Sequence, residues 1–150
     1  MSFIESNLET VLSCLDRLEE NTSPAWGTMT AQRMVEHLTE SLAMSMGEGD
    51  HSLITPEEKI SAMQAFLFSE KPMAKNMSVS FAPQHFSLRN ESLELAIDEI
   101  CEKWVDFELF YEDNPVKKAL HPYYGYLDYN GWKALHAKHF THHFLQFNLV

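Results

Sequence analysis

The 150-residue sequence predicts an all-α protein, a four-helix bundle in which one long crossover carries a short extra helix. Apolar residues recur at helical spacing in four separate stretches, and no stretch alternates convincingly with the period of a half-buried strand. Clusters of glycine, proline and short polar residues separate these stretches. At this length we expect a single domain, residues 1–150, with a substantial core.

The first amphipathic stretch predicts a helix of about four turns near the amino terminus. Its apolar face comprises Phe3, Ile4, Leu8, Val11, Leu12, Leu15 and Leu18. Acidic side chains occupy much of the remaining surface. This helix should end at residues 21–24, because proline and short polar side chains favour turns.

The second stretch predicts a helix that Thr28 or Thr30 can cap and that runs to about Met46. Gly47 follows and closes it. The helix contains His37, whose ring would most often be an ordinary partly buried side chain when considered alone. Small or flexible residues that could line a cavity share its face: Thr30, Met34, Ser41 and Met44.

Residues 48–89 are less regular and form the predicted crossover. Residues 55–58, Thr-Pro-Glu-Glu, have the pattern of a capping box and predict a short helix that reaches about Ser69. The Lys-Pro pair at 71–72 should stop it. We expect residues 73–88 to form an extended cover over one end of the domain.

Asn90 is the predicted cap of a long third helix that ends at residues 114–115, Asn-Pro. Its apolar positions repeat at a near-heptad interval: Leu93, Ile97, Ile100, Trp104, Phe107 and Tyr111. Residues 120–127 then form a connection, and Asp128 should cap the last helix.

The last helix, residues 132–147, contains four histidines within eight positions: His136, His139, His142 and His143. At about 100° of rotation per residue, His136, His139 and His143 share one narrow apolar face, and His142 lies at its edge. Single buried histidines are usually core residues bonded to their neighbours. The cluster instead favours a metal site, because His139 and His143 lie one turn apart and could share one ion.

Composition excludes several classes of partner. Eleven lysines and arginines against twenty-two acidic residues give a net charge of −11, spread along the chain, which makes nucleic acid and anionic membranes unsuitable. No apolar run approaches the ~20 residues of a membrane span, and the first residues lack a signal-peptide pattern. We expect a cytoplasmic protein in which Cys14 and Cys101 are reduced core residues.

Two motifs, at residues 26–38 and 121–147, resemble the DinB/YfiT-like superfamily, particularly a subfamily of small stand-alone domains. The first motif is W-G-x-M-T-x-Q-x-M-x-x-H-L. The second, H-P-x-x-G-x-L-x-x-x-x-W-x-x-L-H-x-x-H-x-x-H-H-x-x-Q-F, is the more specific. The resemblance covers most of the chain. It implies an up-down-down-up helix order and a divalent metal ion held by three histidines.

Matched residue by residue, the resemblance implies that the metal ligands are His37, His139 and His143. His136 and His142 then lie beside the ligands or at the rim of the site, although His136 and His139 also form a one-turn pair. The sequence departs from the family pattern at Gly131, where such proteins usually have an acidic residue at the helix start.

Three neutral histidines leave coordination positions open, as in a catalytic metal site. Nickel, zinc and iron(II) suit such ligands. His136 is a candidate proton shuttle, or it orients a ligand, and His121 either reaches the mouth of the site or caps a turn. His51 and His85 are predicted loop residues. Because an unperturbed histidine titrates near pH ~6.5, we expect protons to displace the metal as the pH falls below neutrality.

Two functions remain open from the sequence. The first is a metal-dependent enzyme that activates water or a low-molecular-weight thiol, either a hydrolase or a thiol S-transferase. The alternative is a bundle that binds metal or a small ligand without turnover, and a purely structural bundle is a third reading. The expected partner is a small-molecule substrate. A homodimer could form through the first helix and the tyrosines at 123–126, although a monomer of this length is also adequate.

Overall fold

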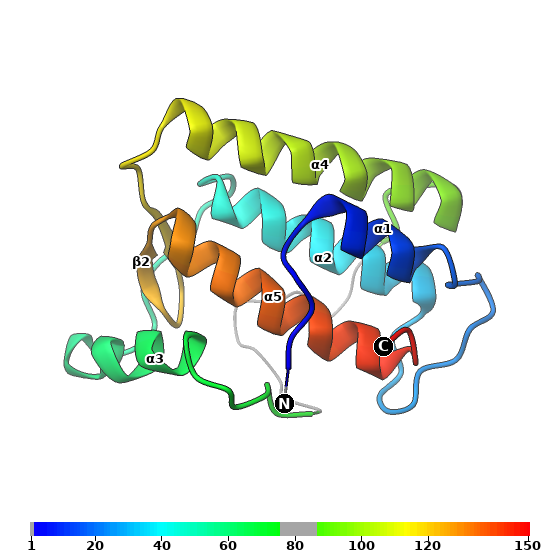
Figure 1. The fold of residues 1–150 in the computed structure, drawn as a ribbon, viewed down its shortest axis with the longest axis horizontal. Helices are drawn as coiled ribbons and strands as arrows, with labels where there is room; N and C mark the ends of the chain where they lie inside the picture. Colours follow the sequence, from blue (N-terminus) through cyan, green and yellow to red (C-terminus); the bar gives the residue numbers. More distant parts are fainter. Residues whose placement is uncertain (1, 76–86) are drawn as a thin grey trace.

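The computed structural model describes residues 2–75 and 87–150 (Figure 1). The chain is mostly helical with one small two-stranded sheet. Its elements are α1 (Leu8–Leu15), α2 (Ala31–Ser45), the 3₁₀ helix η1 (Glu57–Lys59), α3 (Ile60–Leu67), α4 (Leu93–Asp113), β1 (Ala119–His121), β2 (Gly125–Leu127) and α5 (Tyr129–Gln146). In Figure 1, α2 lies between α4 and α5, and it contacts both of them.

The helices that carry the histidines begin at caps that the sequence predicted. The Thr30 hydroxyl accepts a hydrogen bond from the Arg33 amide at 3.1 Å and starts α2. The Asp128 carboxylate accepts from the Gly131 amide at 2.9 Å and starts α5. Each cap satisfies an amide that has no partner within its own helix. The Asp128 cap is confirmed, and of the two alternatives left open for α2 the structure selects Thr30.

The prediction of about four turns for the first helix is wrong, because α1 has eight residues. Its end tightens where the Arg17 and Leu18 amides bond to carbonyls three residues earlier. Ile4 lies before the helix, and its amide donates to the Thr141 hydroxyl of α5 at 2.9 Å. The apolar periodicity is real, but its ends belong to segments that pack on the core without being helical.

Two other helix starts differ from the prediction. Ser92, and not Asn90, caps α4, and its hydroxyl accepts from the Leu95 amide. Asn90 instead bonds to the Glu36 carboxylate of α2. The short extra helix is present as η1 followed by α3, but its cap position is Pro56, which makes no side-chain capping bond. The predicted capping box is therefore not formed.

The connection before α5 contains an antiparallel hairpin that the sequence did not predict. Ala119 pairs with Leu127, and His121 pairs with Gly125. Strands of three residues are too short to display an alternating pattern. The tyrosines of this hairpin were expected to be exposed, but Tyr124 is buried and its ring is parallel to that of Phe66. The hairpin ends at Leu127, and Asp128 directly after it caps α5.

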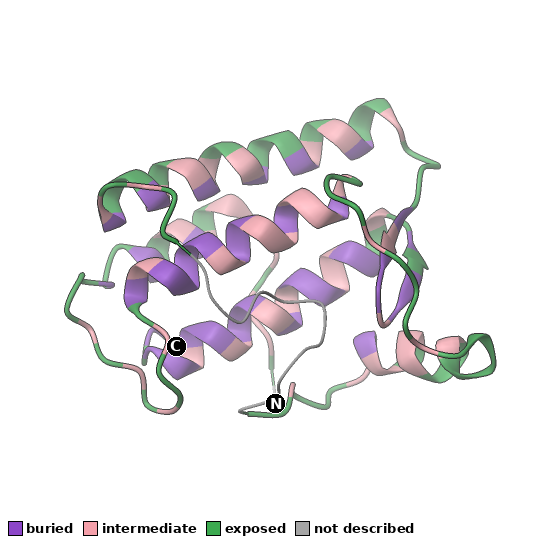
Figure 2. Cartoon of the chain, turned by 180° about the vertical axis from the view of Figure 1, so that it is seen from behind, coloured by how far each residue is buried: buried purple, intermediate pink, exposed green. Residues whose placement is uncertain are grey.

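The core lies between α2, α4 and α5, where their buried residues face one another (Figure 2). Large side chains such as Trp104, Trp132, Phe107, Phe140 and Phe144 fill it. Both cysteines are free thiols; Cys14 is buried in the core as predicted, whereas Cys101 is only half-buried at its edge. Within residues 2–75 and 87–150, no helix combines the length and apolar character needed to cross a bilayer. Most of the predicted extended cover, including His85, falls outside the described residues.

Candidate metal centre

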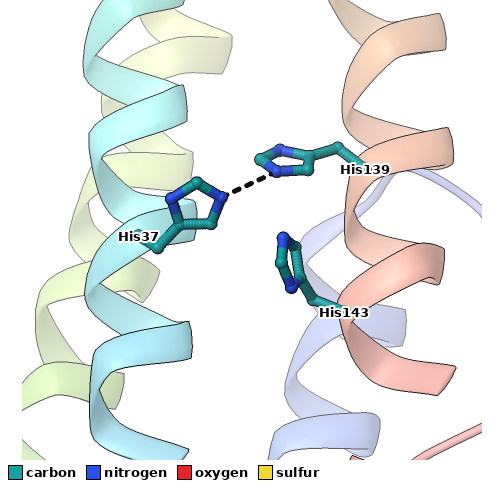
Figure 3. Close-up of side chains that lie close together, drawn as sticks. All are labelled: His37, His139 and His143. Atoms are coloured by element: carbon teal, nitrogen blue, oxygen red, sulfur yellow. Dashed lines mark hydrogen bonds between the residues drawn. The ribbon is translucent and has the colours of Figure 1, made fainter. Parts of the chain in front are cut away.

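Helices α2 and α5 bring His37, His139 and His143 together (Figure 3). His139 and His143 lie one turn apart on α5, and His37 faces them from α2. The Nε2 atoms of His37 and His139 are 2.9 Å apart, and one ligand nitrogen from each of the three rings lies within 4.8 Å of the others. The three residues that the resemblance implied as ligands therefore form one cluster.

The rings would have to rotate for these nitrogens to bind one divalent ion, because their separations, 2.9 Å for one pair and up to 4.8 Å within the cluster, lie on either side of the ideal value. Two nitrogens bound tetrahedrally to zinc at ~2.05 Å lie about 3.3 Å apart. The His37–His139 pair is slightly closer than this, because one ring donates a proton to the other. An ion would require both Nε2 atoms to be unprotonated, so that proton would have to move to Nδ1 of the same ring. Three imidazoles are a donor set suited to zinc, nickel or iron(II).

The orientation of His143 is fixed by hydrogen bonds outside the cluster. Its Nδ1 donates to the side-chain oxygen of Gln146 at 2.8 Å, since that oxygen can only accept. The Gln146 amide nitrogen donates in turn to the Trp26 carbonyl at 3.0 Å, which sets the orientation of the amide. Neutral His143 therefore presents an unprotonated Nε2 for an ion. Sequence reasoning missed this role, although both Gln146 and Trp26 belong to the two motifs.

Burial removes the charge from all three rings at neutral pH. Loss of hydration lowers the pKa of His37 to about 4, and the nearby Glu40 carboxylate only partly opposes this effect. Burial lowers the pKa of His143 to about 3. The pKa of His139 lies well below its usual value, because the ring is buried and His143 and His37 are its neighbours. The folded protein thus holds its imidazoles in the neutral state from which a ring nitrogen can bind a metal ion.

An ion-pair network flanks His37 on α2. The Arg33 guanidinium donates to both oxygens of Glu40, at 2.8 and 2.9 Å, and the two residues lie one turn to either side of His37. Glu40 also accepts from Arg89 at 2.9 Å. The buried Glu36 carboxylate accepts the backbone amide of Arg89 at 2.8 Å. These bonds hold Arg89, shortly before α4, against α2 on either side of His37.

His136 does not join the three ligands. Its ring is fully buried against four aromatic rings at centroid distances of 5.0 to 6.1 Å: Trp104, Phe107, Trp132 and Phe140. Within the part of the chain that the structure describes, neither ring nitrogen of His136 has a hydrogen-bond partner, and neither has the indole nitrogen of Trp132. Burial lowers the pKa of His136 to about 3. His136 was predicted to share one face of the last helix with His139 and His143. The structure divides that face, because His136 faces α4 and the two ligands face α2.

The remaining described histidines lie around the cluster. His142 is half-buried, with its ring 5.0 Å from His143 and 5.5 Å from Trp26. Of the two roles left open for His121, the structure places it in the turn, where Nδ1 accepts from the Tyr123 amide at 3.0 Å. Burial lowers the pKa of His121 to about 3. His51 lies in the loop after α2, half-buried, as expected for a loop residue.

The cluster is chemically suited to an open metal site. Three neutral nitrogens hold a divalent ion and leave positions for water or substrate, whereas a closed structural site needs four protein ligands. Among the described residues, no other group of three histidines, cysteines or acidic residues converges in this way. Neither protein-family models nor curated proteins nor solved structures match this chain.

Proposed function

We propose that this protein is a metal-dependent enzyme of the DinB/YfiT-like superfamily, in which His37, His139 and His143 hold one divalent ion. The observation that carries the proposal is the convergence of three neutral imidazoles from two helices. The proposal includes the four-helix bundle of that superfamily, with up-down-down-up order.

The proposed reaction is hydrolysis or transfer of a small thiol. An ion with open positions lowers the pKa of a bound water or thiol and supplies a nucleophile at neutral pH. The chain contributes the ligands and holds them in place, since Gln146 fixes His143 and the Arg33–Glu40 pair brackets His37. Proton transfer by His136 has weaker support, because its enclosed ring contacts aromatic side chains and no polar partner among the described residues.

The first test is metal content. Tag-free protein should purify with about one nickel, zinc or iron ion per chain, and chelator-treated protein should be stabilised by adding the ion back. An ion present at a hundred times its dissociation constant stabilises a folded protein by about 2.7 kcal/mol. Absence of metal, together with absence of stabilisation by any of the three ions, would leave the histidines as packing residues only.

Substitutions identify the ligands. His37→Ala, His139→Ala and His143→Ala should each abolish stoichiometric metal binding. His51→Ala is the matched control, because His51 is also half-buried but lies outside the cluster. Turnover of ester, amide and thiol-conjugation substrates by the metal-loaded protein then separates an enzyme from a binding protein. A metal-loaded protein that turns over none of these classes would favour the binding function.

A further inference from the structure

A cavity of about 110 Å³ lies against α5, on the face that carries Lys138, Thr141 and His142, next to the face of the metal ligands. It is enclosed by α5, the amino-terminal segment, the loop before α2 and the segment after α3. The lining residues that matter for its chemistry are Phe3, Trp26, Lys75, Lys138, Thr141 and His142. The proposed metal chemistry does not use this cavity.

The charge of the cavity is opposite to that of the whole protein. The chain has a net charge of −11, yet the described residues that line the cavity include two lysines and one histidine and no carboxylate. The Lys75 ammonium lies 4.4 Å above the Trp26 ring. An aromatic wall therefore carries a cation at its edge, which suits a ligand with an apolar part and a negative charge.

Lys138 is the more unusual of the two lysines, because its side chain is only 1% exposed. Its ammonium lies 4.5 Å from the centre of the Phe3 ring and 4.2 Å from that of Phe66. It donates to the carbonyls of Ser69 and Lys71. Over residues 2–75 and 87–150 it forms no ion pair with a carboxylate. A buried cation without a counter-ion favours an anion beside it.

We propose that this cavity binds a small carboxylate with a short apolar chain, about the size of propionate or butyrate. The cavity has the volume of about four water molecules at ~30 Å³ each, and since bonded atoms lie closer together than separate waters, that volume suits the five or six non-hydrogen atoms of propionate or butyrate. The walls of Phe3 and Trp26 favour an alkyl chain over a fully hydrated anion such as inorganic phosphate. The two ammonium groups supply the attraction for the carboxylate.

The cavity shares a residue with the scaffold of the metal site. The Trp26 ring lines the cavity, while its backbone carbonyl accepts from Gln146, which in turn holds His143. The binding proposal itself does not depend on the metal. Titrations of chelator-treated and metal-loaded protein therefore test it separately from the proposed function.

The test is a two-dimensional amide and indole NMR titration with acetate, propionate and butyrate at constant ionic strength. The chain has three tryptophans, so three indole signals are expected, and Trp26→Phe assigns the one in the cavity. That signal should shift saturably, and those of Trp104 and Trp132 should not. Affinity should rise about fourfold for each added methylene group.

Lys75→Met should weaken butyrate binding about fivefold or more, because it removes one cation and keeps an apolar side chain on Trp26. Lys117→Met is the matched control, since Lys117 also lies over an aromatic ring, that of Phe110, but away from the cavity. The Lys117→Met protein should bind butyrate with the same affinity as the unchanged protein. Lys138→Met should also lose binding, with melting curves to show that it remains folded.

Three results would overturn the proposal. The first is that no carboxylate shifts the Trp26 signal saturably. The second is an equal effect of Lys75→Met and Lys117→Met, which would indicate a general response to ionic conditions. The third is a response to inorganic phosphate as strong as that to butyrate, which would show that the apolar wall contributes nothing.

Discussion

Acidification should unfold the metal-free protein well above the pH at which most proteins fail, because folding holds five histidines without charge: His121, His136 and His143 are buried, and His37 and His139 are half-buried. The pKa is lowered to about 4 for His37, to about 3 for His121, His136 and His143, and well below the usual value for His139. An unfolded histidine titrates near pH ~6.5. Between these values the unfolded chain binds more protons than the folded chain, so stability falls as the pH falls below about 6.5.

The magnitude follows from the pKa differences. At pH 5.5 the protonated form of an unfolded histidine exceeds the neutral form by about ten to one, whereas each of these rings remains neutral in the folded protein. Each of the five then costs about 1.4 kcal/mol relative to alkaline conditions, or roughly 7 kcal/mol together. A domain of this kind has a total stability of about 5–15 kcal/mol. We therefore expect cooperative unfolding of metal-free protein near pH 5.

Bound metal should raise this stability by a nearly constant amount from about pH 6.5 to about pH 5, below the range in which a metal-bound water would ionise. The sequence alone predicted that protons would displace the metal just below neutrality. The structure changes that expectation, because the ligand pKa values in the folded metal-free protein already lie at about 4 or below for His37 and His143. Protons and metal then compete for the folded site only near pH 4. Metal release above that pH should accompany unfolding.

Thermal and urea melts followed by circular dichroism, from pH 8 to pH 5 with and without zinc, measure both effects. His136→Leu should reduce the loss of stability of the metal-free protein on acidification by the contribution of one histidine, ~1.4 kcal/mol at pH 5.5. It should leave the stabilisation by zinc unchanged. Constant stability of the metal-free protein over this range would refute the argument from burial. A zinc effect that shrinks steadily from pH 6.5 to pH 5.5 would show that the ligands still titrate near their usual pKa.

Three further predictions concern single features. Gln146→Leu should weaken metal binding by about 10–100-fold, because His143 loses the acceptor that fixes its ring. Gln64→Leu is the control, since it removes a hydrogen bond to the hairpin backbone and should leave metal affinity unchanged. Calorimetric titration with zinc compares the two variants. Gly131→Ala should destabilise the protein by about 1 kcal/mol, because a Cβ atom there would lie 3.1 Å from the Leu127 side chain. Urea unfolding measures this change. An unchanged unfolding midpoint would mean that Leu127 moves aside without cost. Light scattering at micromolar concentration should detect the predicted homodimer, and a monomer mass would exclude it.

The sequence predicted most reliably where local chemistry alone decides the outcome. Thr30 and Asp128 start their helices because their side chains satisfy amides three residues away, which adjacent sequence specifies. Asn90 was a plausible cap of the same kind. It was recruited instead by Glu36, a partner 54 positions away that no local pattern indicates. Tertiary hydrogen bonds thus overrode a local preference.

The candidate site shows the same division. Helical spacing placed His139 and His143 on one side of α5, but only packing shows that His136 faces α4 while they face α2. The bonds from His143 through Gln146 to Trp26 join residues 120 positions apart, so their geometry needed the fold. Motif resemblance identified the residues, and the structure supplied their contacts.

Proton release on metal binding provides a test that separates an enzyme from a passive metal site. The ligand rings are neutral at pH 7, and the His37–His139 pair needs only to move a proton from Nε2 to Nδ1. The ligands should therefore release no proton to the solvent when an ion binds. Water at an open position of a three-histidine zinc site has a pKa near ~7, so it would release about half a proton per ion at that pH and close to one at pH 8. Isothermal titration in buffers with different ionisation enthalpies measures this number directly. Release that rises from pH 6 to pH 8 would indicate an ionising water and support hydrolysis, whereas zero release throughout would indicate a site without activated water and contradict the hydrolase form of the enzymatic proposal.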